Sequence, residues 1–228
     1  MIQHWSLAWR FSFRSSGLLL AFVSGALLFG RLLIAVASME LATSTFSSFE
    51  VVVPLIAGLH AALLFAPDDE PALELLLAAP RPPVFLIYER VAALIGLQGG
   101  LALTLSVVTV LTSPGSNLID IVVRWLPPFV GIVGLCMAAT LYSRRSNFGV
   151  LAAIGICVAM ALGKEVILPV FPHLWFMIFY LDPFTVTTEQ YFLNRLFLLV
   201  VGISLFALVM IRMRDEEMLL GLQEVKNG

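Results

Sequence analysis

Six long apolar runs, separated by short polar or proline-rich stretches, constrain this chain more than any other feature of its sequence. A helix needs about 20 mostly apolar residues to cross the hydrocarbon core of a bilayer. The chain also has 60% hydrophobic and only 12% charged residues, far from the balance of a soluble domain. We therefore predict an all-α integral membrane protein, a single domain over residues 1–228 with six transmembrane helices. The predicted spans are residues 17–37, 51–66, 84–111, 121–142, 148–168 and 193–211.

The distribution of basic residues orients these spans. An even number of spans places both termini on one side of the membrane, and Lys and Arg are enriched in cytoplasmic segments. With the termini in the cytoplasm, nine of the 13 Lys and Arg residues fall on that side: Arg10, Arg14, Arg81, Arg90, Arg144, Arg145, Arg212, Arg214 and Lys226. We expect a multi-pass protein of a bacterial or archaeal cell membrane with both termini in the cytoplasm.

Two segments outside the spans are predicted to lie at the membrane surfaces. In residues 1–16, Trp5 and Trp9 recur at helical spacing beside Arg10, a composition typical of a helix lying in the headgroup layer. An irregular flank of the first span is the alternative. Residues 169–192 are aromatic but interrupted by prolines and acidic residues, so this stretch is too broken to span. We expect it to dip partway into the outer leaflet and to rest on protein.

The sequence carries no recognisable catalytic or cofactor motif. Lys164 follows a glycine, but Val158 stands where a phosphate-binding loop needs another glycine. The three histidines, His4, His60 and His173, lie far apart without cysteine or carboxylate at metal-ligand spacing. We expect no catalytic residue, metal or cofactor in this chain, and the net charge of −2 gives no reason to expect nucleic acid. Work driven by ATP would need a partner chain that binds the nucleotide.

Residues 68–80, between the second and third spans, are predicted to form a short amphipathic helix on the cytoplasmic side. Acidic residues and Pro71 fill its first turn, where the helix dipole favours negative charge, and Pro80 ends it. Helical spacing gathers Leu73, Leu76 and Leu77 on one face and Glu70 and Glu74 on another. Leucines on a loop facing water must be buried against lipid headgroups, the protein's own helix ends or a docked partner.

This segment resembles the signature of the ABC-2 exporter permeases. In that family a Glu-Leu-Leu-(small or polar)-Pro sequence follows the second span and precedes a basic residue that leads into the third. Here residues 74–80 read Glu-Leu-Leu-Leu-Ala-Ala-Pro, followed by Arg81 and Arg90, while Pro82 and Pro83 depart from the polar residues more usual in the family. In outline the resemblance extends to the whole chain: an N-terminal amphipathic helix, six spans, and a broken aromatic segment before the sixth.

The resemblance implies a fold of the ABC-2, or type V exporter, kind and a role as the permease subunit of an ATP-driven exporter. Two permease chains, identical or sister chains, would form the pathway and bind cytoplasmic ATPase subunits that hold ATP and Mg. The segment 68–80 would be the coupling helix that docks on the ATPase. Its expected contact residues are Glu70, Leu73, Glu74, Leu76, Leu77, Pro80 and Arg81. The alternatives are a non-enzymatic membrane assembly or scaffold subunit and an integral membrane enzyme.

Polar residues within the predicted spans need a physical reason, because a charge near the bilayer centre costs about 2.5–3.5 kcal/mol on insertion scales. Arg31 can reach the outer interface, pair with Glu50 or line a substrate pathway. His60 is either a hydrogen-bonded packing residue or part of such a pathway. Gly96 and Gly100 form a small-xxx-small pair, which predicts close helix approach within the protein or in a dimer.

Overall fold

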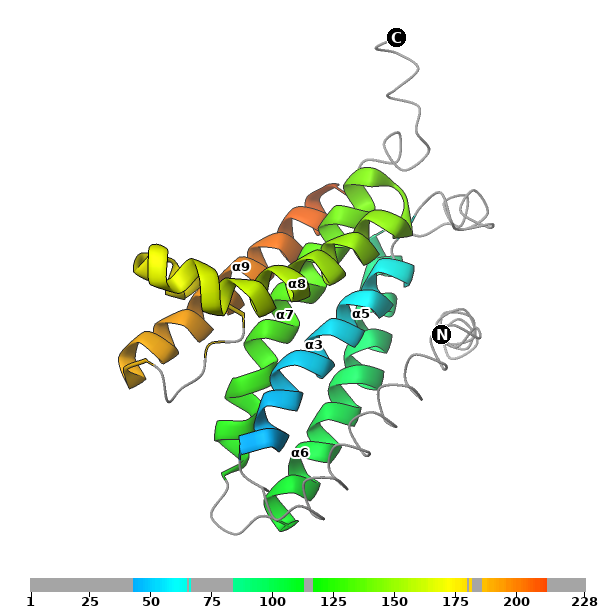
Figure 1. The fold of residues 1–228 in the computed structure, drawn as a ribbon. Helices are drawn as coiled ribbons and strands as arrows, with labels where there is room; N and C mark the ends of the chain where they lie inside the picture. The colour runs from blue at the N-terminus through cyan, green and yellow to red at the C-terminus, as the bar shows by residue number, and fades with distance from the viewer. Residues whose placement is uncertain are drawn as a thin grey trace.

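The computed structural model describes residues 43–64, 66, 84–112, 117–179, 181 and 186–212. Every regular element in these ranges is helical (Figure 1). In chain order they are α3 (Thr43–Leu64), α5 (Val84–Leu94), the π-helix η1 (Ile95–Gly99), α6 (Gly100–Thr112), α7 (Leu118–Ser143), α8 (Ser146–Val170), the 3-10 helix η2 (Pro172–Met177) and α9 (Thr188–Arg212). The interfacial helix expected at 1–16, the first span at 17–37 and the coupling helix at 68–80 lie outside the described residues.

Three helical stretches are long and apolar enough to cross a membrane: Tyr88–Leu111, Leu118–Ser143 and Thr188–Arg212. They coincide with the third, fourth and sixth predicted spans. Two shorter apolar stretches, Val51–Leu64 and Ser146–Ile156, belong to α3 and α8. Three candidate spans in one chain indicate a multi-pass membrane protein, while the total of six stays a prediction.

The helices begin where polar side chains can cap them. Asn117 caps α7, because its side-chain oxygen accepts a hydrogen bond from the Ile119 amide at 3.1 Å. Before α9, the Gln190 amide donates to Thr187 Oγ1 and the Thr187 amide donates to Gln190 Oε1, at 3.3 and 3.2 Å. This reciprocal pair is a capping box. It explains why α9 begins several residues before the apolar run expected at 193–211.

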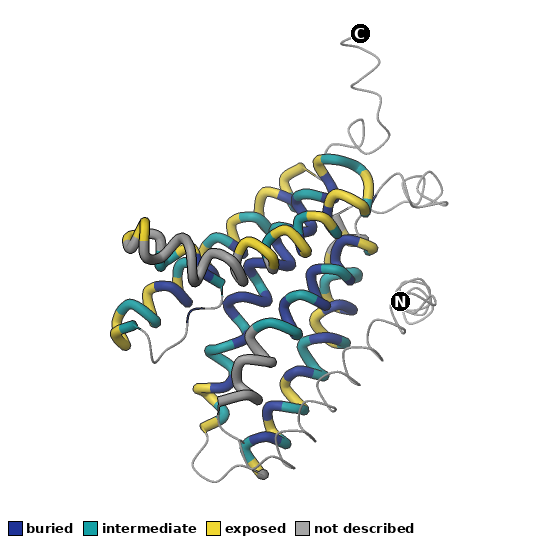
Figure 2. Tube along the Cα trace, viewed as in Figure 1, coloured by how far each residue is buried: buried dark blue, intermediate teal, exposed yellow. Residues whose placement is uncertain are grey.

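Helix α7 is the centre of the bundle. It packs against α3, α8 and α9, which surround it, and α6 contacts it near its N-terminal half (Figure 1). Most of its length is buried, including the two internal prolines Pro127 and Pro128, as the dark tube in Figure 2 shows. Prolines inside a span are tolerated where neighbouring helices cover the freed carbonyl groups.

Glycines bring α7 into close contact with its neighbours. A Cβ atom added at Gly58 of α3 would lie 2.6 Å from Ile132 Cγ2 of α7. One added at Gly202 of α9 would lie 2.7 Å from the backbone of Val130. Small residues at such crossings let helix backbones approach, which is the usual way that helices associate in lipid.

The small-residue pair that the sequence singled out behaves differently. Among the described residues, no heavy atom lies within 4 Å of a Cβ added at Gly96 or Gly100, so these two glycines make no close approach to a described helix. The physical reason is the π-helix. It directs Gln98 into the core and leaves Gly96 exposed.

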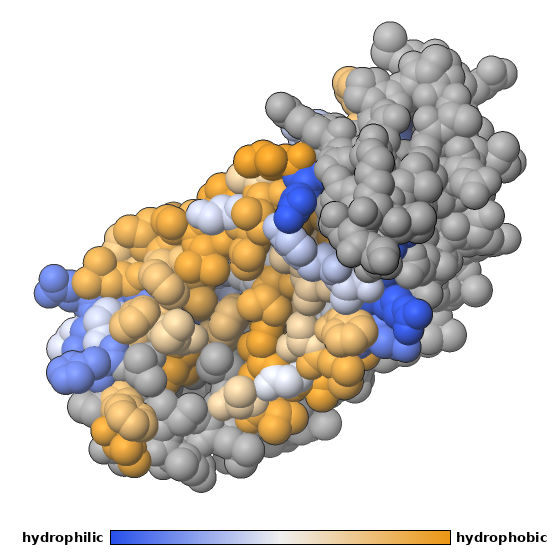
Figure 3. All heavy atoms as spheres, turned by 90° about the horizontal axis from the view of Figure 1, so that it is seen from above, coloured by the Kyte–Doolittle hydropathy of each residue, from blue (hydrophilic) through white to orange (hydrophobic). Residues whose placement is uncertain are grey.

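The outer surface of the bundle is largely apolar. Figure 3 shows a broad hydrophobic face between patches of hydrophilic residues. Large exposed apolar side chains lie along α8 and α9, among them Leu151, Val158, Val200, Ile203 and Ile211. A surface of this kind is suited to lipid rather than to water.

Candidate functional site

Most of the site residues expected from the sequence cannot be placed. Glu70, Leu73, Glu74, Leu76, Leu77, Pro80, Arg81 and Arg31 lie outside the described residues. Glu50 is a residue of α3, and its side chain also lies outside the described part. His60 is therefore the one expected site residue whose side chain can be examined.

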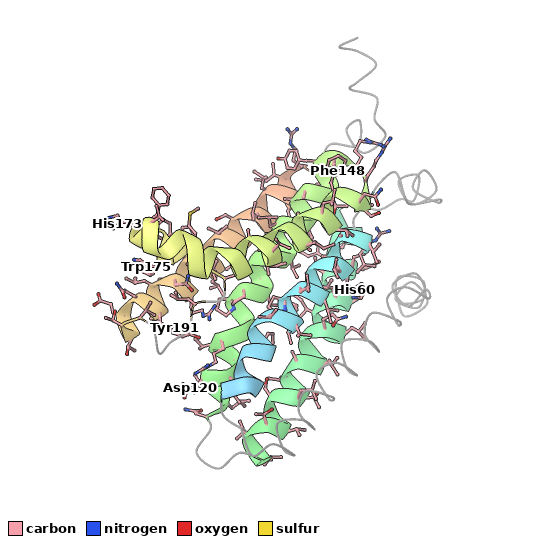
Figure 4. All side chains as sticks on the ribbon, viewed as in Figure 1. His60, Asp120, Phe148, His173, Trp175 and Tyr191 are labelled. Carbon is pink, nitrogen blue, oxygen red and sulfur yellow. The ribbon has the colours of Figure 1, made fainter. Side chains whose placement is uncertain are left out.

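His60 lies in the core of the bundle on the side of α3 that faces α5 (Figure 4). The residue His60 is 1% exposed, and its partner Gln98, in η1, is 3% exposed. The Gln98 Nε2 atom lies 3.4 Å from His60 Nδ1, which is a long hydrogen bond. The amide can donate to Nδ1 when that nitrogen carries no proton, so the direction of this hydrogen bond depends on the tautomer of the ring.

The second ring nitrogen, His60 Nε2, is also buried. Within the described part of the chain it has no hydrogen-bond partner. Leaving a buried polar group unpaired costs about 1–3 kcal/mol. In a bundle surrounded by lipid, buried polar groups of this kind are associated with pathways and moving parts.

Gln98 is a site residue that the sequence did not reveal. It reaches His60 because η1 adds a residue to the helical turn, and the Gly100 amide bonds to the carbonyl oxygens of both Ile95 and Leu97. π-turns within α-helices are rare and are frequently found at functional sites. A glutamine in the middle of an apolar run was the available signal.

A second polar region lies at the end of the bundle where α3, α7 and α9 finish and where α5 and α8 begin. Arg90 of α5 donates from Nη1 to the carbonyl oxygen of Leu64, the last residue of α3. The last carbonyl groups of a helix have no partner within the helix, so an arginine there satisfies one of them. This contact joins the two ends of the loop that contains residues 68–80.

Other arginines gather at the same end. Arg212, in the last turn of α9, lies with its Cζ 5.3 Å from the centre of the Tyr142 ring, and its Nε is 3.4 Å from the Tyr142 hydroxyl. Arg144 ends α7 in the left-handed region, with φ at 65°, and exposed Arg145 follows it before α8 begins. We call this surface the arginine end: Arg90, Arg144, Arg145 and Arg212.

At the opposite end, the start of α9 holds the irregular chain that follows α8. Asn194 is fully buried, and its Nδ2 lies within 3.1 Å of the carbonyl oxygens of Trp175, Phe176 and Ile178. Its two N–H groups thus serve three acceptors. Non-helical backbone at membrane depth needs protein groups to satisfy it, because lipid cannot.

Arg195 continues this clamp. Its Nη1 donates to the Phe179 carbonyl oxygen at 2.8 Å, its Nη2 donates to that of Leu181 at 3.4 Å, and its Cζ lies 4.6 Å from the centre of the Tyr191 ring. The sequence alone predicted no structural role for Arg195. The signal for the clamp was two adjacent polar residues at the beginning of an apolar run.

The described residues hold no group of three or more His, Cys, Asp or Glu side chains that could bind a metal ion. Cys136 is buried, and its Sγ would be 3.0 Å from a Cβ at Gly58, so it fills space at a helix crossing. No family model, curated protein or solved structure matches this chain.

Proposed function

We propose that this chain is the permease subunit of an ATP-driven exporter of the ABC-2 type. One observation carries the proposal. The loop with the Glu-Leu-Leu-Leu-Ala-Ala-Pro sequence at 74–80 leaves α3 and enters α5 at the arginine end, where Arg90 binds the Leu64 carbonyl oxygen. A force applied to this loop therefore acts on both helices at once, which is what a coupling element requires.

The charges at the two ends of the bundle support an orientation with the arginine end in the cytoplasm. The arginine end carries Arg90, Arg144, Arg145 and Arg212, whereas the described basic side chains nearer the other end are Arg124 and Arg195. Lys and Arg favour the cytoplasmic side of a membrane. The loop at 68–80 would then face the cytoplasm, where an ATPase subunit can reach it, and both termini would lie on that side.

In this proposal the nucleotide chemistry belongs to the partner. A cytoplasmic ATPase subunit holds ATP and Mg, and a second permease chain, identical or a sister chain, completes the pathway. The leucines of the coupling helix, Leu73, Leu76 and Leu77, anchor the partner, and the flanking charges Glu70, Glu74 and Arg81 orient it. A membrane assembly subunit, whose loop docks on a partner other than an ATPase, is the alternative that the test must separate.

The test is affinity purification of the chain from its native membranes in mild detergent, followed by an assay for ATPase activity. Leu76→Asp is the perturbation, because it places a charge on the leucine face. Loss of one buried leucine costs about 2–5 kcal/mol, and each 1.4 kcal/mol is a factor of ten, so recovery of the ATPase should fall at least about 30-fold.

Leu75→Asp is the matched control. It makes the same chemical change one residue away, on the other side of the predicted helix. We expect both variants to insert into the membrane and only Leu76→Asp to lose the partner. Full recovery of a stimulated ATPase with Leu76→Asp would refute the proposal. Recovery of a partner without ATPase activity by the wild-type chain would favour the assembly subunit.

A further inference from the structure

The arginine end carries more positive charge than its helix ends need. The C-terminal ends of α3, α7 and α9 lie there, and the carbonyl groups at a helix C-terminus favour a nearby cation. Arg90 already donates to one of these carbonyl oxygens, at Leu64, and Arg144 is itself the C-cap residue of α7. Arg145 and Arg212 remain, and both are exposed. These two arginines therefore need a separate explanation.

Arg212 is held by an aromatic side chain of another helix. Its Cζ lies 5.3 Å from the centre of the Tyr142 ring, and its Nε donates to the Tyr142 hydroxyl at 3.4 Å. This contact uses one of the five N–H groups of the guanidinium. Within the described ranges, the other four N–H groups donate to no residue. Tyr142 thus holds at the surface a pair of terminal nitrogens that can bind two oxygens of a phosphate together.

Arg145 lies close to this pair, in the two-residue turn between α7 and α8. It follows Tyr142 by three residues, so the two Cα atoms are at most about 11 Å apart. Ser143 fixes the turn, since its Oγ lies 3.2 Å from the Arg145 carbonyl oxygen and 3.5 Å from the Arg145 amide nitrogen. The Arg145 side chain forms no hydrogen bond or ion pair with a described residue. Two exposed arginines are therefore attached within a short reach of one tyrosine.

Negative charge is scarce at this end of the bundle. Among the acidic residues in the described ranges, only Glu89 belongs to it, next to Arg90 in α5. The other described acidic residues lie well away along their helices: Glu50, Asp120, Glu165 and Glu189. Four arginines against one glutamate give the described part of the arginine end a net positive charge, which attracts an anion.

The surface next to the two arginines is apolar. Phe148 and Leu151 lie in the first two turns of α8, Leu208 and Ile211 lie in the last two turns of α9, and all four are exposed. Figure 4 places Phe148 at the arginine end, and in Figure 3 hydrophilic residues border the hydrophobic face. Basic and aromatic residues at the edge of an apolar face are typical of the headgroup level of a membrane. This arrangement fits a phospholipid, which joins a charged headgroup to acyl chains, better than a soluble anion.

We propose that Tyr142, Arg145 and Arg212 form a binding site for an anionic phospholipid, which we call the lipid site. The arginines bind the phosphodiester oxygens, and the Tyr142 ring keeps Arg212 in position. The acyl chains lie along the exposed apolar side chains of α8 and α9. Bound lipid joins the end of α7, the start of α8 and the end of α9, so it stabilises this end of the bundle. The site requires no movement of the helices and does not rest on the proposed function.

The test is a lipid titration of the full chain in mild detergent, followed by native mass spectrometry, which counts bound lipid molecules. Dioleoyl phosphatidylglycerol is the anionic probe, and dioleoyl phosphatidylcholine carries the same acyl chains on a headgroup without net charge. An arginine beside an anionic headgroup changes the affinity about fivefold. We therefore expect the first phosphatidylglycerol to bind at least about 25-fold more tightly than phosphatidylcholine. Glycerol 3-phosphate, the soluble probe, should not displace it at equal concentration.

Substitutions then locate the site. Arg145→Gln and Arg212→Gln should each weaken phosphatidylglycerol binding about fivefold and leave phosphatidylcholine binding unchanged. Tyr142→Leu should weaken it by a smaller factor, because Arg212 keeps its charge and loses its support. Arg124→Gln is the matched control, because it removes the same charge near the opposite end of α7. It should change the affinity by less than about twofold.

Three outcomes would overturn the lipid site. The first is equal affinity for the two phospholipids. The second is an equal loss of affinity in Arg145→Gln and Arg124→Gln, which would mean that net charge alone decides binding. The third is displacement of phosphatidylglycerol by an equal concentration of glycerol 3-phosphate, which would mean that the site holds a soluble anion. Because the Arg145 side chain is exposed, the Arg145→Gln arm remains decisive even if Arg212→Gln does not fold.

Discussion

Gly202→Ala should separate α7 from α9, and the structure allows the effect to be sized. The added Cβ would lie 2.7 Å from the carbonyl carbon and oxygen of Val130 and 2.8 Å from the Gly131 nitrogen. Non-bonded carbon atoms prefer about 3.5–4.0 Å. All three neighbours are backbone atoms, so no side chain can rotate away, and the helices must move apart by about 1 Å.

That movement weakens packing along the whole crossing. Leu198 and Val209 of α9 are buried on either side of Gly202, and Gly134 of α7 approaches the Gly202 carbonyl oxygen from across the interface. Inserting a methyl group into a well-packed core costs about 1–3 kcal/mol. Alanine returns up to about 1 kcal/mol through its helix propensity. The net loss should be about 1–2 kcal/mol, which in a chain of this size corresponds to a fall in melting temperature of about 2–8 °C.

Thermal unfolding in detergent, followed by intrinsic tryptophan fluorescence, measures this change. Gly155→Ala is the control, because it makes the same substitution at an exposed position where the added Cβ meets no described atom within 4 Å. Its melting temperature should equal or slightly exceed that of the wild-type chain. If Gly202→Ala inserts normally and melts within about 1 °C of Gly155→Ala, the close crossing of α7 and α9 is not formed and the reasoning fails.

Three further predictions concern the polar contacts and the topology. Asn194→Leu removes the N–H groups that donate to three carbonyl oxygens, so it should lower the free energy of unfolding by about 1–3 kcal/mol. It should also speed proteolysis of the segment before α9, and an unchanged rate of digestion would contradict the clamp. Arg90→Met should speed proteolytic cleavage of the loop between α3 and α5, and Arg90→Lys should restore part of the protection. Equal cleavage rates in the wild-type chain and both variants would contradict the role of the Arg90–Leu64 hydrogen bond. A cysteine at Asn147 should react with an impermeant reagent only after the cells are opened, whereas one at Ser116 should react from outside, and the reverse pattern would invert the topology.

The sequence determined where the helices lie. In lipid, every backbone N–H and C=O group must be satisfied within the chain, so a long apolar run has few choices besides a helix. The predicted ends of α7 and α8 lie within about three residues of those in the structure, whereas α3 begins at Thr43 rather than near residue 51. Asn117 before α7 and the pair Thr187 and Gln190 before α9 are readable as caps once the apolar run is found. The sequence likewise indicated that His60 needed a polar partner or a function.

The sequence predicted only one of the two residues of the candidate site. His60 drew attention as a histidine in an apolar run, but its partner Gln98 lies 38 residues away. Periodicity could not pair them, because η1 changes the direction in which every later side chain of the span points. The tie from Arg90 to Leu64 and the clamp of Asn194 were hidden for a related reason. Each of these contacts joins a side chain to a backbone carbonyl oxygen. Every residue has a backbone carbonyl group, so the sequence does not show which one will be the acceptor.

Tertiary structure alone decided which small residues matter. Gly96 and Gly100 have the spacing of a packing motif but meet no described atom within 4 Å, whereas a Cβ added at Gly202, which has no small residue four positions away, would lie 2.7 Å from the backbone of α7. The spacing of residues along one helix predicts which residues share a face of that helix. It does not predict which residues of other helices pack against that face. The contacts are set by how several helices cross at once, and close packing makes the outcome sensitive to a single methyl group.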